Sequence, residues 1–294
     1  MRVALVCNPR AGSYSLGKLE RLHQSFENAR YLVHRYDSQS FKLDHLASPV
    51  DLVCIAGGDG TVRTTIGNNQ NANHPAPYCI FPMGTINLVA REAGYRVARE
   101  TGFPGLLVRS GDRTHIAGRV GDQVFLCCAS IGPDSHAIAH LSARLKDRFG
   151  RLAYVVALFK FGWTWPRTPL SLTIDGVVHA AEAAFILKGR YYAGPWVLDD
   201  QAGLTRDGFR VLLLPRARRR DFLRLALFGV FGAIFADRRW MRLDARIVDV
   251  SSAAAVPIQA DGDIVAMTPA RITVDPRPLT FLGSVVPQDR QRRN

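Results

Sequence analysis

The chain has 294 residues, of which 47% are hydrophobic and 21% are charged. This composition is that of a globular protein with a substantial core, and it excludes a disordered chain. Lysine and arginine total 38 against 25 aspartates and glutamates, which gives a net charge of +13. Such an excess favours an acidic partner, whether nucleic acid, an anionic lipid surface or a phosphorylated ligand, although solubility alone explains it equally well.

We expect neither an export signal nor a membrane-spanning segment in this sequence. The apolar run after Met1 is too short for a signal peptide. The longest apolar stretch, from Leu225 to Ala236, is well short of the roughly 20 residues that a spanning helix needs. The five cysteines lack metal-ligand spacing, and their odd number is typical of reduced thiols in the cytosol. We therefore predict a cytoplasmic protein without a transmembrane segment, and we leave open whether it docks peripherally at the inner face of the membrane.

The first third of the chain alternates strand and helix patterns. Short apolar runs predict strands at residues 2–8, 31–37, 51–57 and 78–82. Helical patterns cover residues 16–29 and 86–94, the second ending at Gly94. Because strand, loop and helix recur in this order, we predict a parallel sheet with crossover helices.

From about residue 115 the pattern changes to many short strands. Gly121-Asp122 and Asp175-Gly176 are each typical of a tight hairpin turn. Further strands are predicted at residues 209–215, 245–251, 256–266, 270–276 and 279–284. Two helical stretches, roughly 136–165 and 220–235, lie between them, and residues 287–294 are expected to fray. We therefore predict an α/β domain over residues 1–118, which the C-terminal segment is a candidate to complete, and a β-rich domain with helical insertions over residues 119–294.

The stretch Gly57-Gly58-Asp59-Gly60-Thr61 follows the third predicted strand. Glycines let backbone N–H groups approach a ligand closely, and such a turn favours phosphate oxygens. The stretch is not a P-loop, because no Lys-Ser/Thr pair follows it. An aspartate beside phosphates repels them unless a divalent metal lies between, or unless it accepts the proton of an attacking hydroxyl, and both roles belong to phosphoryl transfer. The alternative is a turn in which Asp59 only caps a helix.

A second loop, Pro82-Met83-Gly84, leads from the fourth predicted strand into a helix for which Thr85 is the expected N-cap. A helix N-terminus offers free N–H donors to a phosphate, and Asn87 could reach the same ligand. Two such loops after neighbouring parallel strands carry more weight than one, because ligands bind where those strands end.

Three motifs, in this order and spacing, resemble the catalytic domain of diacylglycerol, sphingosine and ceramide kinases: NPRAG at 8–12, GGDGT at 57–61 and PMGTINLVAR at 82–91. The similarity continues through FGRLAYVVALFK at 149–160, GRYYAG at 189–194, RDGFRVLLL at 206–214 and VPIQADGDIV at 256–265. GGDGT alone is shared with NAD kinases, whereas the full set is fairly specific and covers almost the whole chain.

The resemblance implies an α/β plus β fold. It consists of an N-terminal three-layer α/β nucleotide domain with a parallel sheet and a C-terminal β-sandwich-like domain, with the active site in the cleft between them. The implied activity is transfer of the γ-phosphoryl of ATP, with Mg²⁺, to a hydroxyl of a lipid such as diacylglycerol or a sphingoid base. The implied partner is a lipid substrate at an anionic membrane surface rather than nucleic acid, and a homodimer is left open.

Site residues follow from the same resemblance. Asp59 or Asp261 would accept the hydroxyl proton, and Asp263 would help to hold the metal or to orient Asp261. Asp59 and Asp263 are therefore the predicted metal ligands. The residues predicted to hold ATP are Asn8, Pro9, Arg10, Gly57, Gly58, Gly60, Thr61, Gly84, Thr85 and Asn87.

Three positions depart from the family pattern. Leu88 and Ile116 stand where members carry acids of a water-and-metal network, and Asp263 stands where glutamate is usual. The joint absence of the two acids at positions 88 and 116 suggests that the network is missing. Two alternatives therefore stay open: a protein with the kinase fold that binds nucleotide or lipid with weak or no activity, and a kinase for a soluble hydroxyl compound such as NAD.

Membrane docking has its own candidates. The apolar stretches at 151–165 and 221–235 carry scattered cations, and Trp163 and Trp165 suit a membrane interface. Core packing is the commoner fate of such stretches, and the implied lipid substrate alone favours the membrane. The neighbouring arginine cluster comprises Arg216, Arg218, Arg219, Arg220 and Arg224.

Overall fold

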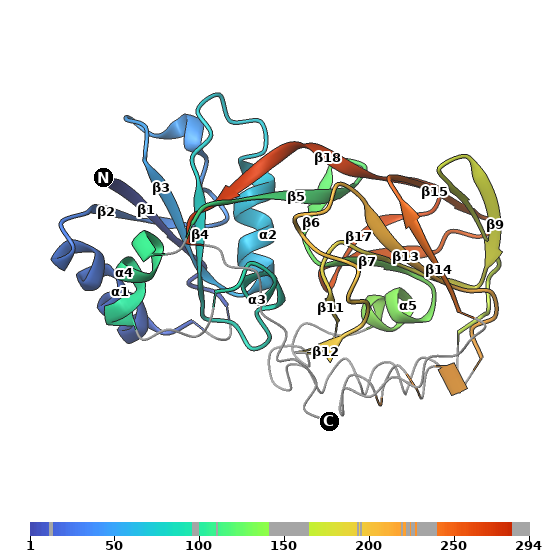
Figure 1. Cartoon of the computed structure of the whole chain (residues 1–294). Coiled ribbons are helices and arrows are strands. Elements are labelled where there is room, and N and C mark those ends of the chain that lie inside the picture. Colours follow the sequence, from blue (N-terminus) through green and yellow to red (C-terminus); the bar gives the residue numbers. More distant parts are fainter. Residues whose placement is uncertain are drawn as a thin grey trace. The chain divides into compact units, whose positions relative to one another are not determined.

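The computed structural model (Figure 1) describes residues 1–11, 14–95, 100–109, 111–140, 165–192, 194, 196–218, 220–221, 224, 227 and 240–283. The chain forms two compact units, one of Met1–His115 with Leu279–Asn294 and one of Ile116–Pro278. Most of the two helices predicted at 136–165 and 220–235 lies outside the described residues. The tail at 287–294, Gly12, Trp163 and Arg219 also lie outside them.

The first unit is built on a parallel sheet with the strand order β2-β1-β3-β4, and the end of β18 pairs with β4 at its edge. Figure 1 shows α1 and α4 on one face of this sheet and α2 and α3 on the other, so the unit has three layers. Its elements are β1 (Arg2–Cys7), α1 (Leu16–Asn28), β2 (Leu32–Asp37), η1 (Leu43–His45), β3 (Leu52–Gly57), α2 (Asp59–Asn68), β4 (Tyr78–Pro82), α3 (Leu88–Glu92), η2 (Glu100–Gly102) and α4 (Phe103–Arg109).

Burial explains why these segments form these elements. Every residue of β3 is buried, because the strand lies between β1 and β4 in the sheet and has helices on both faces. Helix α1 buries Leu19, Leu22 and Phe26, whose spacing places them on one face. Its N-terminus is capped by Ser15, whose side chain accepts a hydrogen bond from the Lys18 N–H. The predicted parallel sheet with crossover helices is therefore confirmed.

Besides the short antiparallel pair of β11 with β12, the second unit contains two groups of antiparallel strands. One has the order β14-β13-β10-β7-β16-β17, and α5 packs against β7, β16 and β17. In the other, β15 pairs with β18 and with β8, β8 pairs with β9, and β5 pairs with β6 and β18. The elements are β5 (Arg113–Val120), β6 (Gln123–Phe125), β7 (Cys128–Ile131), α5 (Pro133–Ala139), β8 (Leu170–Ile174), β9 (Val177–Ala181), β10 (Ala183–Leu187), β11 (Tyr191–Tyr192), β12 (Trp196–Val197), β13 (Phe209–Leu214), β14 (Met241–Ala245), β15 (Ile247–Ser252), β16 (Pro257–Ala260), β17 (Asp263–Met267) and β18 (Ala270–Phe281).

Both predicted hairpins are present, and two predicted strand divisions are wrong. The strand predicted at 256–266 is interrupted by the turn at Asp261 and Gly262, which separates β16 from β17. Asp175 and Gly176 have φ of 45° and 89° in the turn between β8 and β9, the left-handed conformation that a tight hairpin turn requires. The sequence predicts two strands at 270–276 and 279–284, whereas β18 is one continuous strand of 12 residues. Pro276 and Pro278 lie two residues apart, so their missing N–H groups face the same edge and the strand continues through them.

Candidate functional site

The parallel register brings three loops to one edge of the first unit's sheet. Cys7 near the end of β1 pairs with Ala56 near the end of β3, and Gly57 pairs with Pro82 at the end of β4. The loops that follow these three strands therefore begin side by side, and they carry most of the predicted nucleotide-binding residues. In parallel α/β sheets this carboxyl edge is where ligands bind.

Two of these loops touch through their glycines. A Cβ on Gly84 would lie 2.5 Å from the Cα of Gly58, and a Cβ on Gly58 would lie 3.1 Å from the Cα of Gly84. The Met83 N–H also donates to the Gly57 carbonyl at 3.0 Å. The approach of the two backbones therefore requires glycine at position 84, since the atom in the way belongs to the main chain.

Asn87 shapes the second loop and begins α3. Its φ is 54°, a left-handed conformation that asparagine tolerates. Its Oδ1 accepts from the Gly84 N–H at 2.7 Å, and its Nδ2 donates to the Gly84 carbonyl at 2.5 Å. Thr85 was predicted to be the N-cap, but the N-cap is Asn87 and Thr85 is exposed. The two hydrogen bonds of the Asn87 side-chain amide close the loop directly before Leu88. Helix α3 therefore begins later than the sequence indicates.

Asp59 joins the two loops. It is the first residue of α2, and its Oδ1 accepts from the Val89 N–H, in the first turn of α3, at 2.8 Å. The carboxylate thus helps to cap a helix that is not its own. The N-cap of α2 is Gly58, which brings no side-chain acceptor to the first N–H groups of that helix. A half-buried carboxylate and the N-terminus of a ten-residue helix therefore lie at the same place.

The remaining nucleotide-binding candidates differ in exposure. The Asn8 Oδ1 accepts from the Arg10 N–H at 3.0 Å, and the Arg10 side chain is 75% exposed, with its Nη2 3.3 Å from the Asp37 Oδ2. Gly60 is exposed, and so is Pro9. Thr61 is buried, and its Cβ lies 2.6 Å from the place where a Cβ on Gly57 would be, so this threonine fills the space beside the turn.

Asp261 lies in the second unit, in the turn between β16 and β17, with φ of 48°. Its Oδ2 accepts from the Leu126 N–H at 2.6 Å, and its Oδ1 accepts from the Cys127 and Cys128 N–H groups at 2.8 and 3.0 Å. Three main-chain donors thus bind one carboxylate. Asp263, half-buried, begins β17 two residues later.

Beneath this turn lie three buried polar residues that the sequence did not predict as site residues: Gln259, Ser130 and Asp134. The Gly262 N–H donates to the Gln259 Oε1 at 2.9 Å, and the Gln259 Nε2 donates to the Ser130 Oγ at 2.9 Å. Ser130 in turn donates to the Asp134 Oδ2. One signal could have found two of them, because Ser130 and Gln259 are polar residues within the otherwise apolar strands β7 and β16. Asp134 lies in the first turn of α5 and gives no such signal.

Two of the positions that depart from the family pattern, Leu88 and Ile116, contribute no acid. Leu88 is the first residue of α3, and Ile116 lies in β5 with its N–H bound to the Leu204 carbonyl at 2.8 Å. Among the described residues, no group of three or more histidines, cysteines, aspartates or glutamates could hold a metal ion. All five cysteines are buried free thiols.

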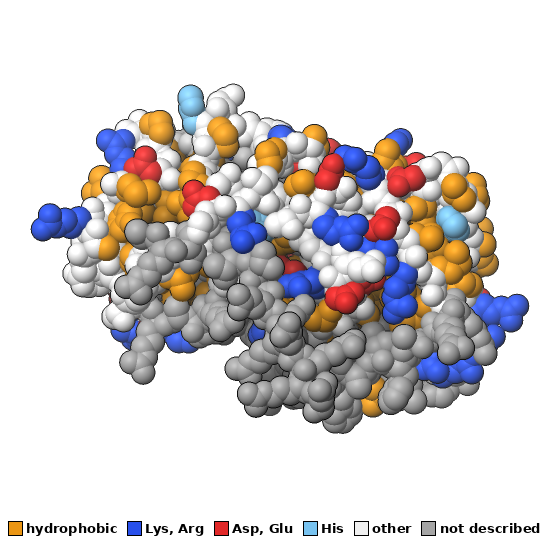
Figure 2. Space-filling model, viewed as in Figure 1, with side chains coloured by type: hydrophobic (Ala, Val, Ile, Leu, Met, Phe, Trp, Pro, Cys, Tyr) orange, Lys and Arg blue, Asp and Glu red, His pale blue; other side chains and the backbone are white. Residues whose placement is uncertain are grey.

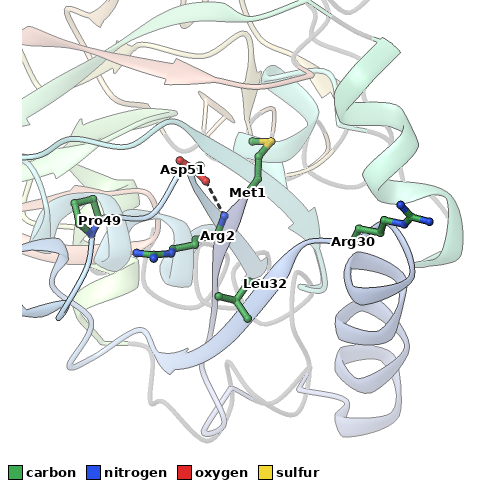
Figure 3. A pocket seen from close by; sticks show the side chains of 6 residues that line it. All are labelled: Met1, Arg2, Arg30, Leu32, Pro49 and Asp51. Atoms are coloured by element: carbon green, nitrogen blue, oxygen red, sulfur yellow. Dashed lines mark hydrogen bonds between the residues drawn. The ribbon is translucent and has the colours of Figure 1, made fainter.

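A pocket lies at the opposite edge of the first unit's sheet (Figure 3). There the Arg2 N–H donates to the Asp51 Oδ2 at 2.7 Å. None of the predicted site residues lines this pocket, so it is separate from the loops described above. Its lining consists of Met1, Arg2, Arg30, Leu32, Pro49 and Asp51.

Comparison with known proteins shows which families share this architecture. The family model of the diacylglycerol kinase catalytic domain matches residues 2–116 of the sequence. The family model of the YegS C-terminal NAD kinase beta sandwich-like domain matches residues 128–283. A diacylglycerol kinase of Bacillus subtilis is 23% identical over 277 residues, 91% of each chain. One of Staphylococcus epidermidis is 22% identical over 284 residues, covering 92% of this chain and 88% of the relative.

Solved structures agree in fold. A crystal structure of a diacylglycerol kinase from Bacillus anthracis superimposes with a TM-score of 0.74 at 19% identity, over 96% of both chains. An NAD kinase from Archaeoglobus fulgidus in complex with ATP gives a TM-score of 0.56 at 15% identity, over 96% of this chain and 93% of that one. At these identities the likeness shows the fold alone.

The fold is therefore that of the lipid kinases, with a mixed α/β N-terminal part and an antiparallel β-sandwich-like C-terminal part. The chain belongs to the family that joins a diacylglycerol kinase catalytic domain to a YegS C-terminal domain, and so to a family of phosphotransferases. Within the described residues, every helix is too short or too polar to cross a membrane.

Proposed function

We propose that this protein is an ATP-dependent lipid kinase that transfers the γ-phosphoryl of ATP to a hydroxyl of a lipid, such as diacylglycerol or a sphingoid base. One observation supports this most strongly. Two glycine loops at the ends of neighbouring parallel strands are joined by one carboxylate, that of Asp59, which accepts from the Val89 N–H at 2.8 Å. A site that binds only phosphate does not need a carboxylate there.

The loop residues divide into two roles in this proposal. The turn from Gly58 to Thr61 offers the first main-chain N–H groups of α2 to the phosphates. Gly84 and Asn87 build the second loop, since the Asn87 amide is bound at both ends to Gly84. Asn8 has a similar building role in the loop after β1, because its side chain accepts from the Arg10 N–H.

Mg²⁺ fits this arrangement as an ion carried by the nucleotide. Magnesium in kinases is usually held by one or two carboxylates together with substrate phosphates, so a complete protein cage is not required. Asp59 is the carboxylate of the first unit that would hold it, and Asp263 is the candidate in the second. When bound, the ion neutralises the charge that develops on the phosphoryl oxygens.

Asp59 is the stronger candidate for the group that accepts the hydroxyl proton. It lies at the N-terminus of α2 and bonds to the first turn of α3, so in this proposal it stands beside the phosphates. Both oxygens of Asp261 accept main-chain N–H groups, three in all, which favours a structural role for that carboxylate. We therefore assign Asp261 to holding the turn that carries Asp263.

The proposal is tested by incubating the protein with γ-labelled ATP, Mg²⁺ and a total lipid extract supplemented with NAD. Label that partitions into the organic phase supports a lipid kinase and identifies the lipid. Label in a soluble product would instead indicate a kinase for a compound such as NAD. Binding of ATP without any transfer would favour the alternative suggested by Leu88 and Ile116, a nucleotide-binding protein with the kinase fold.

A further inference from the structure

The turn between β16 and β17 is held from two sides. It consists of Asp261 and Gly262, with φ of 48° and 90°, both in the left-handed region. The Asp261 carboxylate binds the main chain of residues 126–128 on one side. On the other side, the Gly262 N–H donates to the Gln259 Oε1 at 2.9 Å. Two side chains therefore fix a segment that has only two residues.

The orientation of the Gln259 amide follows from its partners. The Gly262 N–H can only donate, so the oxygen of the amide must face it. The amide nitrogen then faces the Ser130 Oγ at 2.9 Å and the Asp134 Oδ2 at 3.4 Å. Gln259 and Ser130 are also direct neighbours across the pair of β16 and β7. A flipped amide would face donor to donor, so only one arrangement satisfies every group.

The lower end of this chain of hydrogen bonds is a buried carboxylate. Gln259, Ser130 and Asp134 are 3%, 0% and 9% exposed. Burial raises the pKa of Asp134, while hydrogen bonds from Ser130, Tyr192 and Gln259 lower it. A buried polar network in which each member has partners is rigid and specifies one arrangement. The network therefore links Asp134 of α5 and Ser130 of β7, through Gln259, to Gly262 in the turn between β16 and β17.

We propose that Gln259 is a positioning residue, which with Ser130 and Asp134 holds the turn that carries Asp261 and Asp263 in the geometry needed for phosphoryl transfer. This inference rests on the proposed function of the chain. Gln259 acts through the Gly262 N–H rather than on the substrate, so its loss changes the turn and leaves the nucleotide loops of the first unit unchanged. A misplacement of about 1 Å can cost about 100-fold in rate.

Gln259→Met is the decisive variant, because methionine has a similar length and neither accepts nor donates as the amide does. Ser130→Ala is the second variant, since it removes only the hydroxyl between Gln259 and Asp134. The matched control is Gln123→Met, which makes the same exchange at an exposed position of β6 in the same unit. For each, thermal unfolding, hydrogen exchange of residues 257–265, kcat and the KM for ATP are measured.

In Gln259→Met we expect the Gly262 amide to exchange at least about tenfold faster and kcat to fall about 10- to 100-fold, while the KM for ATP stays within about twofold. Ser130→Ala should shift both quantities in the same direction by less, and Gln123→Met should shift neither. If Gln259→Met does not fold, Ser130→Ala alone decides.

Unchanged exchange at Gly262 in a folded variant would overturn the inference, and so would faster exchange with an unchanged kcat. If the wild-type protein phosphorylates no lipid, the proposed function fails. The exchange measurement then still decides whether Gln259 holds the turn.

Discussion

At Gly58 and Gly84 the main chains of two loops meet without a side chain between them. A Cβ at position 84 would lie 2.5 Å from the Gly58 Cα and 2.7 Å from the Asn87 Oδ1. Neither neighbour can move freely, because the first is backbone and the second is bound to Gly84 itself. The carboxyl edge of the sheet, where we propose that the nucleotide binds, thus depends on glycine at position 84 for its shape.

Gly84→Ala should therefore lower both stability and ATP affinity. We expect a loss of about 1–3 kcal/mol in the free energy of unfolding, as for other overpacked sites, and at least about tenfold weaker ATP binding. Chemical denaturation and calorimetric titration with ATP measure the two effects. The matched control is Gly67→Ala in α2, where an added Cβ meets nothing within 4 Å. Equal behaviour of the two variants would contradict the role of close approach at position 84.

Asp261→Asn should destabilise the second unit as well as change the charge. An amide offers one acceptor oxygen, so its nitrogen would face at least one of the main-chain donors of Leu126, Cys127 and Cys128. We expect a cost of about 1–3 kcal/mol in the free energy of unfolding. Asp122→Asn is the control, because that side chain is fully exposed and lies 3.6 Å from its arginine partner. An Asp261→Asn protein as stable as the wild type would show that these bonds contribute little.

At the scale of elements, three strands of the first unit, β1, β3 and β4, could be predicted from the sequence because nearly all of their residues are buried. Residues 52–57 form a central parallel strand, and a strand buried on both faces reads as a continuous apolar run. The hairpin at Asp175-Gly176 could be predicted because left-handed residues are needed there. Strand ends were harder, since the prolines of β18 end a strand in most contexts but lie on one edge here.

The interior of the candidate site could be predicted only in part. The motifs locate Asp59 and Gly84, but the bond from Asp59 to Val89 spans 30 residues and depends on the register of β3 with β4. The motif at 256–265 contains Gln259 but does not indicate its role, because that role depends on Ser130, which lies 129 residues away on a neighbouring strand. Contacts of this kind follow from tertiary packing, and local patterns do not contain them.

Lys188 is the most deeply buried cation among the residues that the structure describes. It is 0% exposed, and its ammonium donates to the Arg206 carbonyl and, at 3.2 Å, to the Gly208 carbonyl. These bonds tie the end of β10 to the start of β13. Burial lowers its pKa from 10.5 to about 8.

This shift predicts a pH dependence of stability. Between pH 8 and 10.5 the folded protein has released the Lys188 proton while the unfolded chain still holds it. Unfolding then takes up a proton, so the contribution of Lys188 to the free energy of unfolding rises with pH across this window and is lost again as the pH falls through 8. Denaturation of the wild type and of Lys188→Met at pH 7.5 and 10 measures the difference. The exposed Lys42, replaced by Met, is the control. Parallel curves for wild type and Lys188→Met would refute the shift.

At the scale of the whole molecule, the net charge is +13, but the described side chains on the face that Figure 2 shows do not gather into one dense basic patch. Blue and red side chains alternate over the described surface there, and several form ion pairs, such as Arg206 with Asp244 and Arg246 with Asp207. Asp221, at the arginine cluster, accepts from the Arg218 N–H and lies 3.4 Å from Arg224, whereas the exposed Arg216 and Arg220 have no ion pair to an acid in the described part of the chain.

These two arginines should contribute to membrane docking. An arginine near an anionic surface is worth about 1 kcal/mol, or about fivefold in affinity. We expect Arg216→Gln and Arg220→Gln each to weaken binding to phosphatidylglycerol vesicles by that factor, with little effect on phosphatidylcholine vesicles and a loss of the difference at high salt. Vesicle sedimentation measures both, and the exposed Arg30, replaced by Gln, controls for net charge. Equal losses in all three variants would assign the effect to total charge rather than to this cluster.

The most direct measurement compares wild type with Asp59→Asn in the transfer of γ-label from ATP to lipid. The amide oxygen of the variant can still accept from the Val89 N–H, so the loops and the melting temperature should be preserved. We predict labelled lipid from the wild type and at least about 100-fold less from Asp59→Asn, with ATP still bound. Comparable transfer by the two proteins, or no labelled lipid from the wild type, would contradict the proposal that Asp59 serves a lipid kinase.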